Sequence, residues 1–301
     1  MKRMNPTLAK AIGFALSGVA LSLAGTSVAS AHVAYNTYNA HTSYTPTDAG
    51  SKGTDGWVWG GIGATSGGNS QNASGWVGST GAPLGYVGAP HLNWAAMLHS
   101  AGGSLEVSQA DAFADYGVYA DIDTAGGAWR DVSNTPQGWK HNTDIGLFKS
   151  DVTQYVHLNI SAINGPIANF GVTVFEGMAT NVTGYSHHGA WNNQPAGSPA
   201  IPALNKFPIG MANPFGTTGL STVVGYDETV DSINAFSFLA QAGTVYSIYL
   251  GGNGGLNWNQ QHDGYVLNIT SSPVPVPGAV WLFGSAVLGM LGLRRKAKLV
   301  A

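Results

Sequence analysis

The chain has 301 residues, 43 glycines, no cysteine and only 9% charged residues. The lack of cysteine excludes disulfides, thiolate metal sites, iron–sulfur clusters and c-type haem attachment. Of the 12 lysines and arginines, three lie in residues 1–31 and four in residues 294–301, which leaves five between them against all 15 aspartates and glutamates. This acidic middle segment has no basic cluster, so nucleic acid is not an expected partner.

Residues 1–31 have the pattern of a signal peptide. Basic residues precede an apolar stretch at 11–24, and the small-x-small sequence A-S-A ends at Ala31. We therefore expect an exported protein whose mature chain begins at His32.

Residues 32–270 are expected to form one all-β domain, an antiparallel sandwich or jelly roll with long glycine-rich loops. The clearest strand is 152–160, where Val156, Leu158 and Ile160 alternate with polar or aromatic residues. Similar patterns predict strands at 170–175, 235–239, 244–250 and 265–269. Two short helices are also expected, one at 93–99 and one capped by Ser108 that stops at Gly117.

The C-terminal residues have the pattern of a membrane-sorting tail. A proline-rich linker at 271–277 precedes a weakly polar run at 278–293, and a basic segment follows at 294–301. The run would be ~24 Å long as a helix, short for a ~30 Å hydrocarbon core but able to lie in it with the basic residues on the cytoplasmic side.

The sequence V-P-V-P-G-A-V-W-L-F-G-S in this tail resembles the PEP-CTERM signals that bacterial exosortases recognise. Val276 stands where such signals usually carry glutamate. The resemblance implies a sorting enzyme of the exosortase type as a partner, and an outer surface or exopolysaccharide matrix as the destination. It also implies a transient or permanent inner-membrane anchor.

Two histidine-containing segments suggest a metal site. In Trp139-Lys140-His141, an extended chain places the indole and the imidazole on the same side, since side chains repeat every two residues. His187 or His188, in a later loop, could add a second imidazole. Two imidazoles and an aromatic wall suit copper, especially Cu(I). The alternative is a buried indole beside an exposed histidine.

The stretch G-W-K-H-N-T-D-I-G-L-F-K-S-D-V-T, with N-F-G-V-T-V-F-E-G-M and Y-S-H-H-G, resembles the copper-repressible surface-associated Cu(I)-binding proteins of methanotrophs, the CorA and MopE group. The resemblance implies copper held by two histidines and one tryptophan, the latter oxidisable to kynurenine. It matches Trp139 and His141, and leaves His187 and His188 as alternatives.

His32 offers a second metal hypothesis. A free α-amine and ring nitrogen at the mature N-terminus could chelate Cu(II), as in the histidine brace of lytic polysaccharide monooxygenases and some periplasmic copper carriers. Such a brace needs another histidine, for which His41, His91 and His99 are candidates. The alternative is that the cleavage site precedes a histidine by coincidence, since chain termini are usually disordered.

Asp121 and Asp123, two residues apart, could hold calcium at a strand end, or could simply form a solvated acidic face. No catalytic motif accompanies them, so we expect no enzyme activity. The expected function is an exported, non-enzymatic copper-binding surface protein involved in copper acquisition or handling. The alternatives are a matrix or carbohydrate-contacting protein without a metal site, and a copper oxygenase built on His32.

Overall fold

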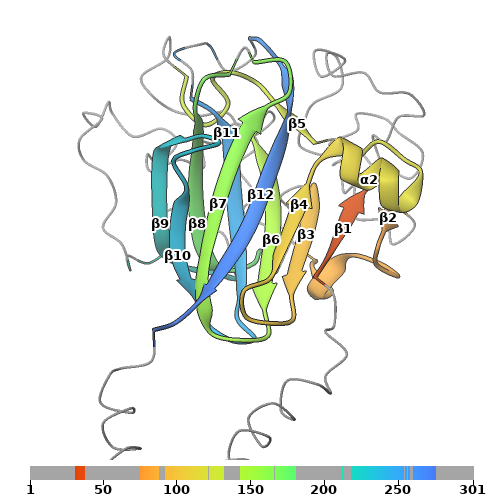
Figure 1. Ribbon diagram of the computed structural model, residues 1–301, viewed down its shortest axis with the longest axis vertical. Coiled ribbons are helices and arrows are strands. Elements are labelled where there is room, and N and C mark those ends of the chain that lie inside the picture. Colours follow the sequence, from red (N-terminus) through yellow and green to blue (C-terminus); the bar gives the residue numbers. More distant parts are fainter. Residues whose placement is uncertain are drawn as a thin grey trace, which may run out of the picture.

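The computed structural model describes residues 31–37, 75–87, 92–120, 122–131, 143–165, 167–180, 210, 212, 218–253, 255, 257 and 260–275. These residues form two β-sheets stacked as a sandwich (Figure 1), which confirms the all-β prediction. No helix among them is long and apolar enough to cross a membrane. The predicted span at 278–293 lies outside these ranges.

The larger sheet has seven strands in the order β2-β1-β3-β6-β11-β8-β9. Their bounds are β1 His32–Asn36, β2 Trp76–Val77, β3 Trp94–Leu98, β6 Asp144–Ser150, β8 Phe170–Gly177, β9 Leu220–Val230 and β11 Val245–Gly252. Neighbouring strands in this sheet are antiparallel except β3 and β6, which run parallel. That parallel pair departs from the expected purely antiparallel architecture.

The smaller sheet has the order β10-β7-β12-β4, and a short strand β5 also pairs with β12. Their bounds are β4 Ser104–Val107, β5 Asp123–Thr124, β7 Gln154–Ala162, β10 Phe236–Ala240 and β12 Asp263–Pro273. Between the sheets lies an apolar core to which Val156, Leu158 and Ile160 contribute, each at most 1% exposed. The alternation predicted for this strand is therefore confirmed.

One of the two predicted helices is confirmed and the other is wrong. Helix α2 (Gln109–Tyr116) begins after Ser108, whose hydroxyl accepts a hydrogen bond from the Asp111 N–H, and ends at left-handed Gly117. The segment at 93–99 is strand β3 instead. Its alanines and leucine favour a helix weakly, and pairing with β1 on one side and β6 on the other overrides that preference. A 3-10 turn, η2, also occurs at Pro83–Gly85.

The indole of Trp94 joins the two sheets. Trp94 is fully buried in β3, and its Nε1–H donates to the Tyr265 hydroxyl of β12 at 3.0 Å. The Tyr265 hydroxyl in turn donates to Asp144 Oδ2 at 2.7 Å, back in the larger sheet. Burial raises the pKa of Tyr265 well above its ordinary value, so this phenol keeps its proton and remains a donor.

The same indole lies against Gly146, the residue paired with Trp94 across the β3–β6 ladder. A Cβ added at Gly146 would come within 2.1 Å of the ring atom Cζ2. Because the indole is hydrogen-bonded at Nε1 and packed on all sides, it cannot move aside without breaking the contact between the sheets. Glycine is therefore required at this position for packing.

We predict that Gly146→Ala lowers the free energy of unfolding by about 3 kcal/mol or more, because a methyl group must displace a fixed aromatic ring. Gly117→Ala is the matched control, since an added Cβ there meets nothing within 4 Å and only the left-handed backbone is strained. The control substitution is expected to lower the free energy of unfolding by about 1 kcal/mol. Equal losses in urea unfolding would show that the indole does not constrain Gly146.

Candidate metal centre

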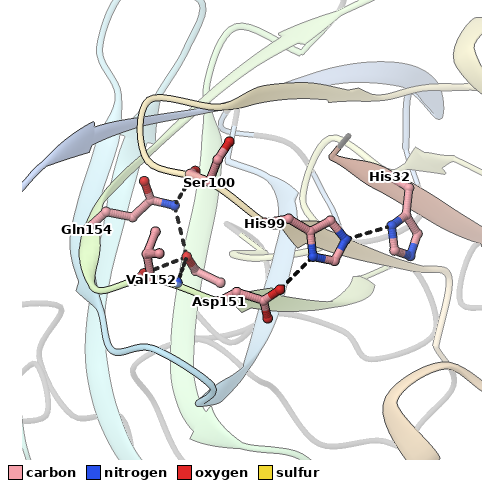
Figure 2. A network of polar contacts seen from close by, with 7 residues as sticks. His32, His99, Ser100, Asp151, Val152 and Gln154 are labelled. Carbon is pink, nitrogen blue, oxygen red and sulfur yellow. Dashed lines mark hydrogen bonds and ion pairs between the residues drawn. The ribbon is translucent and has the colours of Figure 1, made fainter. Parts of the chain in front are cut away.

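Two histidines distant in sequence meet at one end of the larger sheet. His32 is the first residue of β1 and pairs with Met97 of β3, which places His99 diagonally across from it on the same face. Their rings are nearly parallel, with centroids 5.2 Å apart and planes inclined by 22°. The Nδ1 atom of His32 lies 3.2 Å from Nε2 of His99 (Figure 2).

Asp151 orients the ring of His99. It follows β6, and its backbone N–H donates to the Leu98 carbonyl at 2.9 Å, which brings the carboxylate beside β3. Asp151 Oδ2 then lies 2.6 Å from His99 Nδ1. A carboxylate accepts, so His99 donates from Nδ1, and in the neutral ring the lone pair is on Nε2, the nitrogen that faces His32. Carboxylate–histidine pairs orient metal ligands in this way.

A buried glutamine clamps the two turns that carry His99 and Asp151. The Gln154 side chain, which is fully buried, donates from Nε2 to Ser150 Oγ at 2.9 Å and to the Ser100 carbonyl at 3.4 Å. Its Oε1 accepts from the Gly102 N–H at 3.3 Å. These bonds tie the turn after β3 to the turn after β6 (Figure 2), so the His99–Asp151 pair is held by fixed backbone.

The electrostatic environment favours neutral His32. Its pKa is lowered first by desolvation and then by repulsion from His99, while the Asp151 carboxylate opposes the shift. Neutral imidazole is the form that binds metal ions, because a protonated ring has no free lone pair. The site therefore holds one of its two candidate ligands in a binding-competent state.

The separation of the two nitrogens suits a shared cation. With metal–nitrogen bonds of about 2.0 Å, nitrogens 3.2 Å apart subtend an angle of about 105°, close to tetrahedral. In the absence of a cation, the same distance fits a hydrogen bond from His32 Nδ1–H to His99 Nε2. No group of three or more histidine, cysteine or acidic side chains within the described ranges is arranged to hold a metal, so this pair supplies two protein ligands.

Met97, beside the histidine pair, offers a candidate sulfur ligand. Met97 is partly exposed and stands directly opposite His32 in the β1–β3 register, on the face that carries both histidines. Opposite residues in an antiparallel ladder have Cβ atoms about 4.5–5.5 Å apart. A flexible thioether at this position is within reach of an ion held between the imidazoles.

Most of the other predicted site residues lie outside the described ranges. This holds for Trp139, His141, His187, His188 and Asp121, and for two candidate partners of His32, His41 and His91. Asp123 lies in β5 and is 3% exposed. His157, on the smaller sheet, contacts Ser237 Oγ at 2.7 Å and Ser272 Oγ at 3.0 Å.

The structure places His99, one of the three histidines proposed as partners of His32, beside it, and it adds Asp151. The sequence carried no direct signal for Asp151, because its position beside His99 depends on the parallel β3–β6 pairing, in which Leu98 lies opposite Ser150. The available hint was an acidic residue directly before the predicted strand at 152–160.

Comparisons with known proteins give two weak structural likenesses. No family model matches the chain, and no curated protein matches it. One solved structure is described as "CorA is a surface-associated copper-binding protein important in Methylomicrobium album BG8 copper acquisition"; it has 10% identity and a TM-score of 0.29, covering 56% of this chain and 92% of its own.

The second is mercury-soaked MopE, described as a secreted protein of Methylococcus capsulatus in which an oxidised tryptophan facilitates copper binding. It has 14% identity and a TM-score of 0.25, and the match covers 59% of this chain and 87% of that one. Both TM-scores are too low to establish a common fold, so any function proposed for this chain has to rest on its own residues.

We predict that His32 in the metal-free protein titrates below pH 6.5, and that Asp151→Asn lowers its pKa further by removing the opposing carboxylate. At pH values between the His32 pKa of the folded chain and that of the unfolded chain, the unfolded chain binds a proton that the folded chain does not bind. The free energy of unfolding should therefore fall as pH drops from above 6.5 through the pKa of His32, and level off below it.

NMR titration of the ring protons measures the pKa, and urea unfolding with a chelator present measures the stability. His32→Asn should remove this part of the pH dependence. A His32 midpoint at or above 6.5 would contradict the description of its environment.

Proposed function

We propose that the protein is an exported, surface-associated copper-binding protein, and that His32 and His99 hold the ion with Asp151 positioning His99. The observation that carries this proposal is the 3.2 Å approach of His32 Nδ1 to His99 Nε2, with the other nitrogen of His99 on a carboxylate. A carboxylate in this place orients the ring and raises its basicity, which strengthens a metal bond at Nε2.

Copper is favoured among the divalent ions by the ligand types. Sites built from nitrogen ligands bind Cu²⁺ most tightly in the first-row series, and a thioether such as Met97 suits Cu⁺. Zn²⁺ sites usually have three or four protein ligands, more than this pair supplies. The acidic charge of the exported segment also attracts cations to its surface.

Trp139, His141 and one of His187 and His188 remain a second candidate ligand set, supported by the W-x-H spacing and by the family resemblance. This set would hold Cu(I) with two imidazoles and an indole. The two candidate ligand sets predict that different single substitutions remove copper, so experiment can distinguish them.

We predict that the exported, processed protein contains copper when purified without added metal, and that His99→Ala abolishes high-affinity binding at the His32–His99 pair. Asp151→Asn should lower affinity roughly 10- to 100-fold, since it removes only the orienting partner. His157→Ala is the matched control, because its imidazole contacts two serines on the other sheet. Metal analysis and competition titration with a copper chelator provide the measurements.

Loss of copper in His141→Ala with full retention in His99→Ala would move the site to the Trp139 segment. Absence of copper from the wild type would favour the alternative of a matrix or carbohydrate-contacting protein without a metal site. Calcium at Asp121 and Asp123 is tested in the same metal analysis.

Export and sorting are expected to be separable. A chain without residues 1–31 should stay in the cytoplasm, whereas a chain without residues 273–301 should cross the inner membrane and be released, because only the first segment carries a cleavage sequence and only the second a basic stop. Cell fractionation and immunoblotting distinguish the compartments. A tail-less protein that remains anchored would contradict the sorting proposal.

A further inference from the structure

The histidine pair alone leaves a metal ion short of ligands. Two nitrogens at about 105° leave the opposite side of a three- or four-coordinate ion open, whereas a two-coordinate ion would prefer its nitrogens about 4 Å apart and in line. Asp151 is already engaged with His99 Nδ1. A further donor has to come from close to His32 or His99 on the exposed side of the pair.

The start of β1 is held in place, unlike most chain termini. Val33 is 5% exposed and Tyr35 is fully buried, and both belong to the core between the sheets. The Tyr116 hydroxyl donates to the Val33 carbonyl at 2.8 Å. Pairing with β3 begins at His32 itself, so a chain that started there would keep the whole of β1.

We propose that cleavage after Ala31 creates the missing ligand, so that the new α-amine of His32 chelates the same ion as His32 Nδ1 while His99 Nε2 supplies the third nitrogen. This inference rests on the copper function proposed above and adds to it a dependence on processing. The peptide nitrogen of an uncleaved chain cannot replace the amine, because its lone pair is delocalised into the carbonyl.

The chelate follows from the covalent structure of an N-terminal histidine. The amine and Nδ1 belong to one residue and close a six-membered ring through the metal, so binding one brings the other to a high effective concentration. Near neutral pH the amine, of ordinary pKa ~7.7–8.0, releases one proton to solvent when Cu²⁺ binds. Neutral His32 releases none, because its single ring proton passes from Nδ1 to Nε2 by exchange with solvent. The bonds formed are three nitrogen–copper bonds, and no oxidation or reduction is involved.

This arrangement would couple metal loading to export. In the cytoplasm the precursor has two imidazoles and no amine at this point, so its affinity for Cu²⁺ stays low. Removal of residues 1–31 outside the cytoplasm adds the third nitrogen without moving β1. The site is therefore assembled only where the protein is expected to work.

The test compares the processed wild type with a variant that carries Ser-Ala-Pro inserted between Ala31 and His32. The variant keeps both imidazoles but moves the free amine three residues away, and its proline has no N–H that could ligate in place of the amine. With Cu²⁺ alone as the probe, the wild type is expected to show three coupled nitrogens in its electron paramagnetic resonance spectrum. The variant is expected to bind roughly 100-fold more weakly.

A second comparison keeps the chain unchanged. Mild acylation of the processed wild type near pH 7 modifies the α-amine before the lysines, whose pKa is ~10.4, and should cause the same loss. Mass spectrometry verifies the N-terminus and the single modification, and thermal unfolding without copper verifies the fold.

Equal affinity and identical spectra for blocked and unblocked protein would overturn the inference while leaving the copper function intact, as would a mature chain that does not begin at His32. Failure of the processed wild type to bind Cu²⁺ at all would remove the proposed function, and this inference with it. His99→Ala in the processed protein should keep the two nitrogens of the amine chelate and lose the third.

Discussion

The pairing of β3 with β6 is the constraint on which the rest of the structure depends. The Trp94 indole of β3 fixes this pairing, because it lies on Gly146 of β6 and donates a hydrogen bond across the core to the Tyr265 hydroxyl. That hydroxyl in turn donates to Asp144 of β6. A slip of one residue would turn every β3 side chain to the opposite face. The same register sets Leu98 opposite Ser150 and so brings the following residues of each strand together.

The histidine pair combines one rigid half with one that the proposed cleavage after Ala31 would complete. His99 is held by Asp151 and by the turns that Gln154 ties together, so its lone pair has a fixed direction before any metal arrives. His32 lies on a strand anchored by core residues, and under the proposed processing its α-nitrogen would change from a peptide nitrogen to a free amine. Preorganisation of His99 would then lower the free-energy cost of binding, and the amine at His32 would add affinity.

The candidate site and the C-terminal end of β12 lie at the same end of the sandwich. In Figure 1, β1 begins and β12 ends at the lower end of the molecule, where the turn after β3 is also found. The Ser271 N–H of β12 donates to the Gly103 carbonyl of that turn at 3.0 Å. Under the proposed sorting, copper would therefore bind on the side of the domain from which the membrane segment departs.

Local patterns in the sequence determined the features that depend on near neighbours. Alternation along β7 predicted its buried face, and a serine and a glycine nine residues apart predicted the limits of α2. Tertiary structure alone decided that β3 is a strand and that His32, His99 and Asp151 meet, across separations of 67 and 52 residues. Such contacts follow from strand order and register, which arise when whole sheets pack together, and no short stretch of sequence encodes them.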